Sequence, residues 1–263
     1  MTQIFKQLVK SLIMKLVPSF RPPVLCTPRQ RYEGIAINNK IDTSKPYIAL
    51  TFDDGPSQGV NLQHDFNREA YDKYGTLKTL DILRKYEAKA TFFVLGEHIS
   101  STEKSALLAI HHAGHELGVH GWRHDCSLDD IPLHQVEHDL KLTKNLINEI
   151  TGQNPTVMRP PRGHADPVTA QLIFRGTGMR AVLWSEATYD WKNRPTQQAL
   201  EHVMRTLGPG SIVLMHDIYS STPETLELLL VEIRKRGLCC VTLSELISTS
   251  NESPHFSPLP EQY

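Results

Sequence analysis

The chain is poor in cysteine, with four among 263 residues: Cys26, Cys126, Cys239 and Cys240. No two of them form a CxxC pair, so the sequence gives no support to a thiolate zinc site. Cys239 and Cys240 lie in an apolar stretch, and adjacent cysteines seldom pair with each other. We therefore expect these two side chains to be buried free thiols.

The charges are nearly balanced: the chain has 28 basic and 29 acidic residues, and its formal net charge is −1. No basic stripe interleaved with aromatic residues is present, so the sequence predicts no nucleic-acid partner. Histidine is abundant instead, with 13 residues. That number raises the expectation of a metal site without locating it.

Residues 1–20 have no uninterrupted apolar run. Apolar side chains recur there at helical spacing, and Lys6, Lys10 and Lys15 occupy the other face. This pattern predicts an amphipathic helix, and neither a transmembrane span nor a clear signal peptide. The helix either packs on the domain or a partner, or makes peripheral contact with a membrane through anionic headgroups. We accordingly expect the protein in the cytoplasm or at the membrane surface or cell envelope.

From residue 46 onward, apolar β-prone segments alternate with amphipathic helical ones. Strands are expected near 48–52, 88–95, 116–120, 156–159, 179–184, 211–216 and 238–243, and helices over 76–86, 102–113, 132–150, 166–176, 195–207 and 223–236. Seven alternations predict an α/β fold with a parallel sheet, open or closed into a barrel. This domain would span 46–249, preceded by the helix and a linker over 1–45 and followed by a tail over 250–263.

Chemically competent side chains gather where the predicted strands end. The carboxyl ends of parallel strands carry the active site in such folds, so these side chains are expected to meet. Two adjacent carboxylates at the end of a buried strand repel each other unless a cation lies between them. The strand-end residues are Asp53, Asp54, His120, Arg159 and His216, with Asp190 and Trp191 in the loop after the fifth strand.

His120 and His124 are four positions apart, a spacing that places both imidazoles on one face of a helical turn. Two imidazoles and one carboxylate form a three-ligand set that leaves a coordination position for water or substrate. The sequence therefore predicts one divalent metal. This donor set suits Zn²⁺ best and admits Co²⁺, Ni²⁺ or Fe²⁺.

Five motifs in order resemble those of the polysaccharide deacetylase family, also called the NodB-homology or carbohydrate esterase family 4 domain. The resemblance covers about residues 46–245. The motifs are Thr51-Phe52-Asp53-Asp54-Gly55-Pro56, Gly114-His115-Glu116 with His120 and His124, Arg159-Pro160-Pro161, Asp190-Trp191 after Trp184-Ser185, and Leu214-Met215-His216-Asp217.

The resemblance implies a distorted (β/α)7 barrel and a role for each matching residue. Asp54, His120 and His124 would hold the metal, Asp53 would be the general base toward water, and His216 the general acid toward the departing amine. Arg159 would orient the base, and Asp190 would tune the acid. The substrate contacts implied are those of Pro161, Arg162, Trp191 and Leu214, although Trp191 is also compatible with plain core packing.

Three positions depart from the family's pattern. Arg162 stands where an aromatic residue is common, Ala187 where an acid is frequent, and Gly121 where Ser or Thr is usual. None of these removes a ligand or a proton-transfer group, so they bear on substrate choice. Residues 58–74 are an insertion beside the predicted metal, and we expect them to line or cap the substrate groove.

The leading functional expectation is a metal-dependent hydrolase that removes N-acetyl groups from an N-acetylated oligo- or polysaccharide, chitin-like or peptidoglycan-like. An acetamide is a poor electrophile with a poor leaving group, so its hydrolysis needs an activated nucleophile and a proton for nitrogen. Two alternatives remain: a deacylase of a lipid-linked amino sugar at a membrane, suggested by residues 1–20, and a glycan-binding module without catalysis.

Overall fold

The computed structural model of the chain describes residues 40–57, 75–99, 103–125, 127–164, 167–192 and 194–250. The predicted helix over 1–20 and the insertion over 58–74 lie outside the described residues. The linker as far as residue 39 and the tail from residue 251 lie outside them as well. The roles expected of these segments therefore stay predictions.

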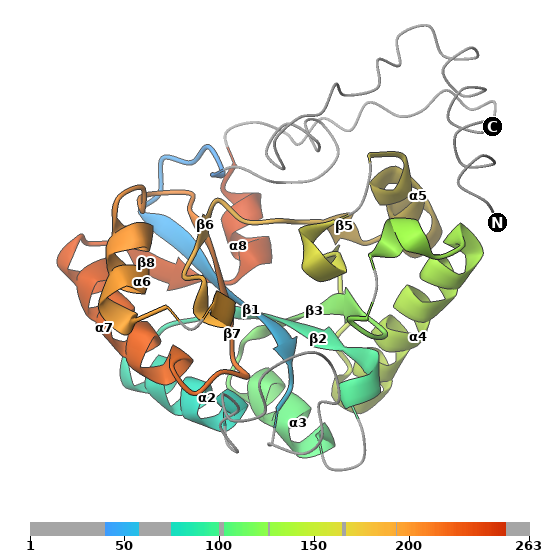
Figure 1. Ribbon diagram of the computed structural model, residues 1–263, viewed down its shortest axis with the longest axis horizontal. Helices are drawn as coiled ribbons and strands as arrows, with labels where there is room; N and C mark the ends of the chain where they lie inside the picture. Colours follow the sequence, from blue (N-terminus) through green and yellow to red (C-terminus); the bar gives the residue numbers. More distant parts are fainter. Residues whose placement is uncertain are drawn as a thin grey trace, which may run out of the picture.

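The strands form one curled sheet with the order β5-β4-β3-β2-β1-β7-β6, and β8 pairs with β1 off this path (Figure 1). Every pairing in the described chain is parallel, which confirms the predicted α/β class. No pairing among the described residues joins β5 to β6, so the sheet is an open, distorted (β/α)7 barrel. The strands are β1 (Tyr47–Gly55), β2 (Thr91–Leu95), β3 (Glu116–Gly121), β4 (Val157–Met158), β5 (Arg180–Ala181), β6 (Glu186–Ala187), β7 (Ile212–His216) and β8 (Cys239–Val241).

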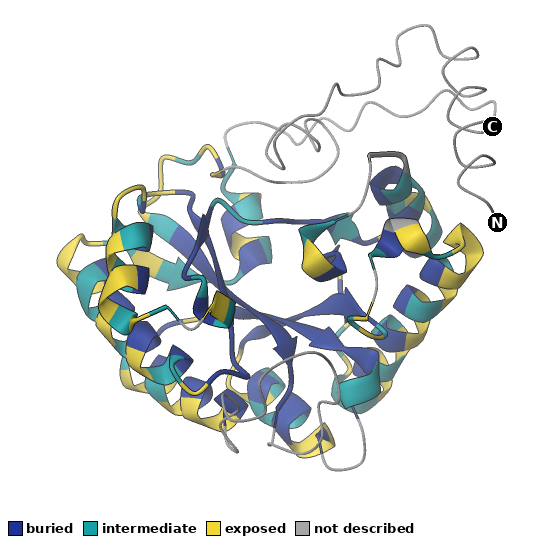
Figure 2. Ribbon diagram, viewed as in Figure 1, coloured by how far each residue is buried: buried dark blue, intermediate teal, exposed yellow. Residues whose placement is uncertain are grey.

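Helices form the outer layer around this sheet (Figure 1). The central strands β1, β2, β3 and β7 are almost entirely buried, whereas the helices carry exposed residues on their outer faces (Figure 2). Across the described ranges, no helix combines the length and the apolar character needed to cross a membrane. The helices are α2 (Gly75–Lys85), α3 (Lys104–His112), α4 (Leu133–Thr151), α5 (Pro167–Thr177), α6 (Thr196–Met204), α7 (Thr222–Lys235) and α8 (Leu243–Ser248).

β1 lies at the centre of the core because its apolar run is covered on both faces, as expected of a strand in a parallel sheet. Ile48, Leu50 and Phe52 are fully buried, and the Phe52 ring stacks on the Phe92 ring with centroids 5.0 Å apart. Burying a side chain of this size contributes about 1.5–3 kcal/mol. The end of β1, where Asp53 and Asp54 follow Phe52, is therefore held rigidly.

The predicted fifth strand over 179–184 is wrong in extent. β5 ends at Ala181, and a separate short strand, β6, pairs with β7 instead. The cause is Arg159, whose guanidinium donates hydrogen bonds to the carbonyl oxygens of Val182 and Leu183. Those two carbonyl oxygens accept hydrogen bonds from the Arg159 side chain and not from the backbone N–H groups of a neighbouring strand.

Two features near the C-terminal end also differ from expectation. α8 follows β8 without having been predicted, although Thr242 and Glu245 form a capping box that marks its start. Cys239 is exposed at the first position of β8, and Cys240 is half-buried. Both are free thiols as expected, but the expectation that both are buried is wrong, because alternate residues of an outer strand face opposite sides.

Candidate metal centre and active site

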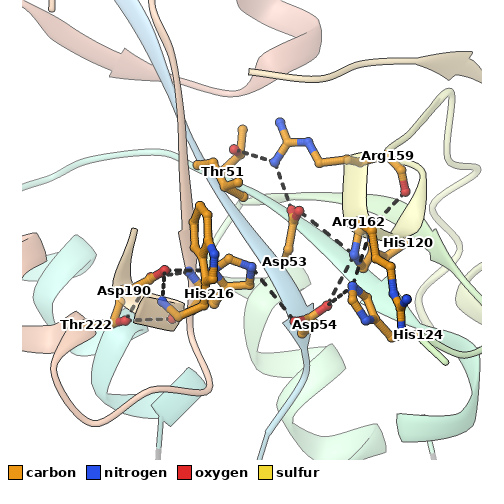
Figure 3. Close-up of polar contacts among 12 residues, drawn as sticks. Thr51, Asp53, Asp54, His120, His124, Arg159, Arg162, Asp190, His216 and Thr222 are labelled. Atoms are coloured by element: carbon orange, nitrogen blue, oxygen red, sulfur yellow. Dashed lines mark hydrogen bonds and ion pairs between the residues drawn. The ribbon is translucent and has the colours of Figure 1, made fainter. Parts of the chain in front are cut away.

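Strand register brings the predicted site residues together. Asp53 of β1 pairs with His216 of β7, so these two side chains leave neighbouring strands at the same height. Val119 of β3 pairs with Met158 of β4, so the next residues, His120 and Arg159, also lie side by side. All four come from carboxyl ends of parallel strands and face one site (Figure 3).

Asp54, His120 and His124 form a cluster of potential metal ligands, with one ligand atom from each lying within 4.8 Å of the others. Nε2 of His120 is 3.2 Å from Oδ1 of Asp54, and Nε2 of His124 is 3.7 Å from the same oxygen. The expectation that both histidines share a helical turn is wrong. His120 lies in β3, and the chain turns at Gly121, where φ is 116°, to bring His124 back.

The donor set fits a divalent metal. Oδ1 of Asp54 is buried and accepts no hydrogen bond, although two imidazole nitrogens face it. Burial acts to raise the pKa of Asp54, but the neighbouring His120, His216 and His124 outweigh it and hold that pKa well below its usual range. A buried anionic oxygen beside two imidazole nitrogens matches the ligand chemistry of Zn²⁺ and related cations.

Each histidine of the cluster is oriented by a backbone group. Nδ1 of His120 lies 2.8 Å from the carbonyl oxygen of Arg159, which only accepts, so Nδ1 donates and Nε2 is the nitrogen turned toward Asp54. The backbone N–H of Arg162 donates to Nε2 of His124 at 3.4 Å. That amide points into the cluster because Arg162 adopts a left-handed conformation with φ of 60°.

Asp54 itself is held in an uncommon backbone conformation, with φ of 70°. Nδ1 of His98 donates a hydrogen bond of 2.9 Å to the Asp54 carbonyl oxygen. His98 ends the short 3-10 helix η2 (Gly96–His98), which directly follows β2. The segment that follows β2 thus supports the backbone turn at Asp54. Because of this turn, the side chains of Asp53 and Asp54 point in different directions.

Asp53 is fixed by a buried cation. Nη1 of Arg159 donates hydrogen bonds of 2.8 Å to Oδ1 of Asp53 and to Oγ1 of Thr51. The guanidinium lies 4.3 Å from the centroid of the Phe93 ring and is fully buried. The other carboxylate oxygen of Asp53, Oδ2, is 3.9 Å from Nε2 of His120, so it faces the metal cluster.

His216 lies on the other side of the cluster, with Nε2 3.9 Å from Oδ2 of Asp54. Its Nδ1 lies 2.8 Å from Oδ1 of Asp190, whose second oxygen accepts from the His216 backbone N–H at 2.7 Å. Burial disfavours the charged imidazole, but the Asp190 carboxylate outweighs burial and raises the pKa of His216 to about 9. Oγ1 of Thr222 lies 3.2 Å from the same carboxylate.

The four predicted substrate residues are placed differently from one another. The half-buried Trp191 ring stands edge-on to His216 with centroids 5.1 Å apart, and the exposed Arg162 side chain bonds to the Asp125 carbonyl oxygen. Pro161 is buried and lies next to Gly121. A Cβ added to Gly121 would come within 3.2 Å of the Pro161 ring. Leu214 is only 3% exposed, which leaves little of its surface for a substrate.

Several supporting residues were missed by sequence reasoning. Thr51, His98 and Thr222 each hold a predicted site residue, yet each is far from it in the chain or too common a residue type to stand out. Asp217 is fully buried beside the site, and its Oδ2 accepts from Oγ1 of Thr76. The position of Asp217 directly after His216 was the feature of the sequence that could have indicated its place beside the site.

The curled (β/α)7 sheet with an Asp-His-His cluster at its carboxyl edge is the NodB-type architecture. The chain belongs to the polysaccharide deacetylase family, whose sequence profile matches residues 40–182.

Individual relatives agree with this assignment. The peptidoglycan-N-acetylglucosamine deacetylase PgdA of Listeria monocytogenes is 34% identical over 199 residues, covering 76% of this chain and 38% of that protein. A peptidoglycan-N-acetylglucosamine deacetylase of Bacillus cereus is 30% identical and covers 79% of this chain and 91% of its own length. The solved structure of the peptidoglycan deacetylase PdaC from Bacillus subtilis superposes with a TM-score of 0.67 at 30% identity, covering 80% of this chain and 93% of that one. The chain spans about two fifths of the full length of the PdaC and PgdA proteins.

Proposed function

We propose that the protein is a metal-dependent hydrolase that removes N-acetyl groups from an N-acetylated glycan of the peptidoglycan type. The observation that carries the proposal is the arrangement around Asp54: a second carboxylate on one side and a histidine paired with a carboxylate on the other. A base and an acid of different chemical type can hold opposite protonation states at one pH. The relatives named above support peptidoglycan as the glycan.

Asp54, His120 and His124 would hold the metal, and we propose Zn²⁺ because one carboxylate and two neutral imidazoles suit it best. The bound cation would polarise the acetamide carbonyl and make water a stronger acid. The Nδ1–H of His120 is committed to the Arg159 carbonyl oxygen, so Nε2 is the nitrogen that would bind the metal. Co²⁺, Ni²⁺ and Fe²⁺ match the same donors less closely.

Asp53 would act as the general base. Its Oδ1 is occupied by Arg159, so Oδ2 is the oxygen that accepts a proton from the attacking water. The buried guanidinium fixes the orientation of the carboxylate. The water oxygen then forms the new bond to the acetamide carbon.

His216 would act as the general acid. Asp190 takes the Nδ1–H, so Nε2 is the nitrogen that gives its proton to the amide nitrogen as the C–N bond breaks. The pKa of about 9 keeps the imidazole protonated at neutral pH. The products are acetate and a free amine on the sugar, and the proton held by Asp53 restores the acid to its starting state.

Acetate release tests the proposal. The metal-loaded protein is incubated with peptidoglycan, with N-acetylglucosamine oligomers and with acetylated xylan, and we expect acetate from the first two. Asp53→Asn should abolish release, whereas Asp81→Asn, at an exposed ion pair on α2, should leave it unchanged. Glycan binding without acetate release by the wild-type protein would show a binding module and contradict the proposal. Acetate from xylan alone would shift the substrate to an ester.

A further inference from the structure

A row of rings leads from His216 toward the surface of α6. The Trp191 ring lies 5.1 Å from the His216 ring, and the Tyr189 ring lies 4.9 Å from the Trp191 ring. The His202 ring stands edge-on to Tyr189 with centroids 5.0 Å apart. Tyr189 and Trp191 belong to the stretch around η5 (Asp190–Lys192), and His202 belongs to α6. All three of these side chains are partly exposed.

Three basic side chains border these rings. Nζ of Lys192 lies 4.9 Å, and Cζ of Arg194 4.6 Å, from the centroid of the Tyr189 ring. Nη2 of Arg205 contacts Nδ1 of His202. Within the part of the chain that the structure describes, none of the three forms an ion pair with a carboxylate.

Two of these basic groups, Arg194 and Arg205, line a shallow hollow of about 540 Å³. Its lining residues are Arg194, Gln198, Glu201, His202, Met204 and Arg205. Glu201 is the acidic residue among them, and it accepts a hydrogen bond from Gln197. Burial, then Arg205 and Arg194, lower the pKa of His202, as expected where the potential is positive.

Tyr189 is held in a costly conformation. Its φ of 57° lies in the left-handed region, which is unfavourable for a bulky residue. The Tyr189 carbonyl oxygen accepts from the backbone N–H of Lys192 at 3.0 Å, which fixes the turn. This turn places the ring between Trp191 and the two cations, an arrangement that the proton transfers by Asp53 and His216 do not require.

We propose that Tyr189, Lys192, Arg194 and His202, the Tyr189 patch, bind a carboxylate carried by the glycan next to the sugar being deacetylated. The inference rests on the proposed function and specifies its substrate. A sugar ring packs on the partly exposed Trp191 ring beside the patch, while the guanidinium and ammonium groups held over Tyr189 pair with the anion. Peptidoglycan offers such a group as the lactyl carboxylate of N-acetylmuramic acid or as a carboxylate of the stem peptide. Chitin oligomers have neither, so the patch favours peptidoglycan over neutral glycans.

The test compares kcat/KM for an anionic and a neutral glycan. Peptide-free peptidoglycan strands, peptide-bearing strands and N-acetylglucosamine tetramers are assayed with Lys192→Gln, Arg194→Gln and the double variant. Because an exposed charge pair contributes about 0.2–1 kcal/mol, the ratio of anionic to neutral kcat/KM should fall about 1.4- to fivefold for each single change. The loss should appear in KM, and raising salt should erase it.

Matched controls remove exposed charges elsewhere. Lys104→Gln on α3 and Arg234→Gln on α7 should leave the ratio unchanged, and thermal melting shows whether each variant is folded. The lactyl carboxyl is free in peptide-free strands and is an amide in peptide-bearing ones. An effect confined to peptide-bearing strands therefore assigns the carboxylate to the stem peptide, an effect confined to peptide-free strands assigns it to the lactyl group, and an effect on both shows that the patch binds either carboxylate. An unchanged ratio in the folded double variant would overturn the proposal, as would an equal fall in the controls.

Failure of the proposed function is distinguishable from failure of the patch. If the wild-type protein releases no acetate from any glycan, binding of the same three glycans is followed by Trp fluorescence. Weaker binding of the anionic strands to Arg194→Gln than to Arg234→Gln would still support the patch. Equal binding by the two variants would overturn it.

Discussion

Arg159 and Asp53 are joined by a hydrogen bond of 2.8 Å between Nη1 and Oδ1, and both side chains are buried. Burial lowers the pKa of Arg159, and Asp53 opposes that effect. The same guanidinium bonds to Thr51, Val182 and Leu183, so all its nitrogens are used. One side chain therefore positions the proposed base and also shapes the loop between β5 and β6.

Arg159→Lys should damage both stability and activity. A lysine ammonium cannot supply the planar set of donors that reaches Asp53, Thr51 and two carbonyl oxygens. Disrupting a buried ion pair costs about 3–5 kcal/mol, and we expect a loss near the low end because one charge is kept. Urea unfolding measures the stability change, and acetate release should show a fall in kcat. Arg236→Lys, at a pair of helix-end carbonyls on the surface, is the control. Equal effects of the two substitutions would contradict the special place of Arg159.

Asp190→Asn should move the alkaline limit of activity to lower pH. The proposed acid, His216, must be protonated, so activity falls as the pH rises through its pKa. Asp190 is the group that raises this pKa to about 9 against burial, so removing its charge lowers the pKa. The pH profile of kcat/KM for the two proteins makes the comparison. An alkaline limb at the same pH in both would exclude His216 as the titrating acid.

His115 should make folding stability depend on pH. Burial, then Lys89, lower its pKa to about 4, and its Nδ1 accepts a hydrogen bond from the Ala90 N–H at 3.2 Å. The folded-state pKa is depressed, so this contribution is fully present above the unfolded value of about 6.5 and is lost as the pH falls toward 4. The loss amounts to at most about 3.4 kcal/mol, at 1.36 kcal/mol per pKa unit.

His115→Asn tests this contribution. An Asn side chain retains an acceptor for Ala90 and does not titrate, so its free energy of unfolding should change less between pH 7 and pH 4.5 than that of the wild type. The exposed His134 offers the control His134→Asn, which should follow the wild-type curve. Parallel curves for His115→Asn and wild type would contradict the assignment.

Gly55→Ala should destabilise the protein and weaken metal binding. A Cβ at this position would lie 2.7 Å from Oδ1 and 2.8 Å from Oδ2 of Asp217. Asp217 is fully buried and held by Thr76, whose Oγ1 also accepts from the Ser57 N–H. Overpacking of this kind costs about 1–3 kcal/mol and shifts the backbone next to Asp54. Gly208→Ala, whose Cβ would meet only the Lys40 side chain at 3.5 Å, should be neutral in the same melting and metal-binding assays.

Much of the site was predictable because strand-end position is visible in the sequence. An apolar run that stops at Asp53 and Asp54 marks the edge of a parallel sheet, and β7 stops at His216 in the same way. The parallel fold then places these ends together whatever the loop lengths. The alternation of apolar strands and amphipathic helices predicted the α/β class for the same reason.

Details that depend on long-range partners could not be predicted. The spacing of His120 and His124 suggested a helix, but the chain turns at Gly121, where φ is 116° and Pro161 leaves little room for a side chain. β5 ends early because of Arg159, about 20 residues before it in the chain, and His98 supports Asp54 across 44 residues. Local propensity carries no information about such contacts.

The central claim is that Asp54, and not its neighbour Asp53, holds a metal together with His120 and His124. Metal content per chain after dialysis, measured for the wild type, Asp53→Asn and Asp54→Asn, tests it most directly. The account predicts one equivalent of divalent metal in the wild type and in Asp53→Asn, and almost none in Asp54→Asn. Loss of metal from Asp53→Asn with retention in Asp54→Asn would contradict it.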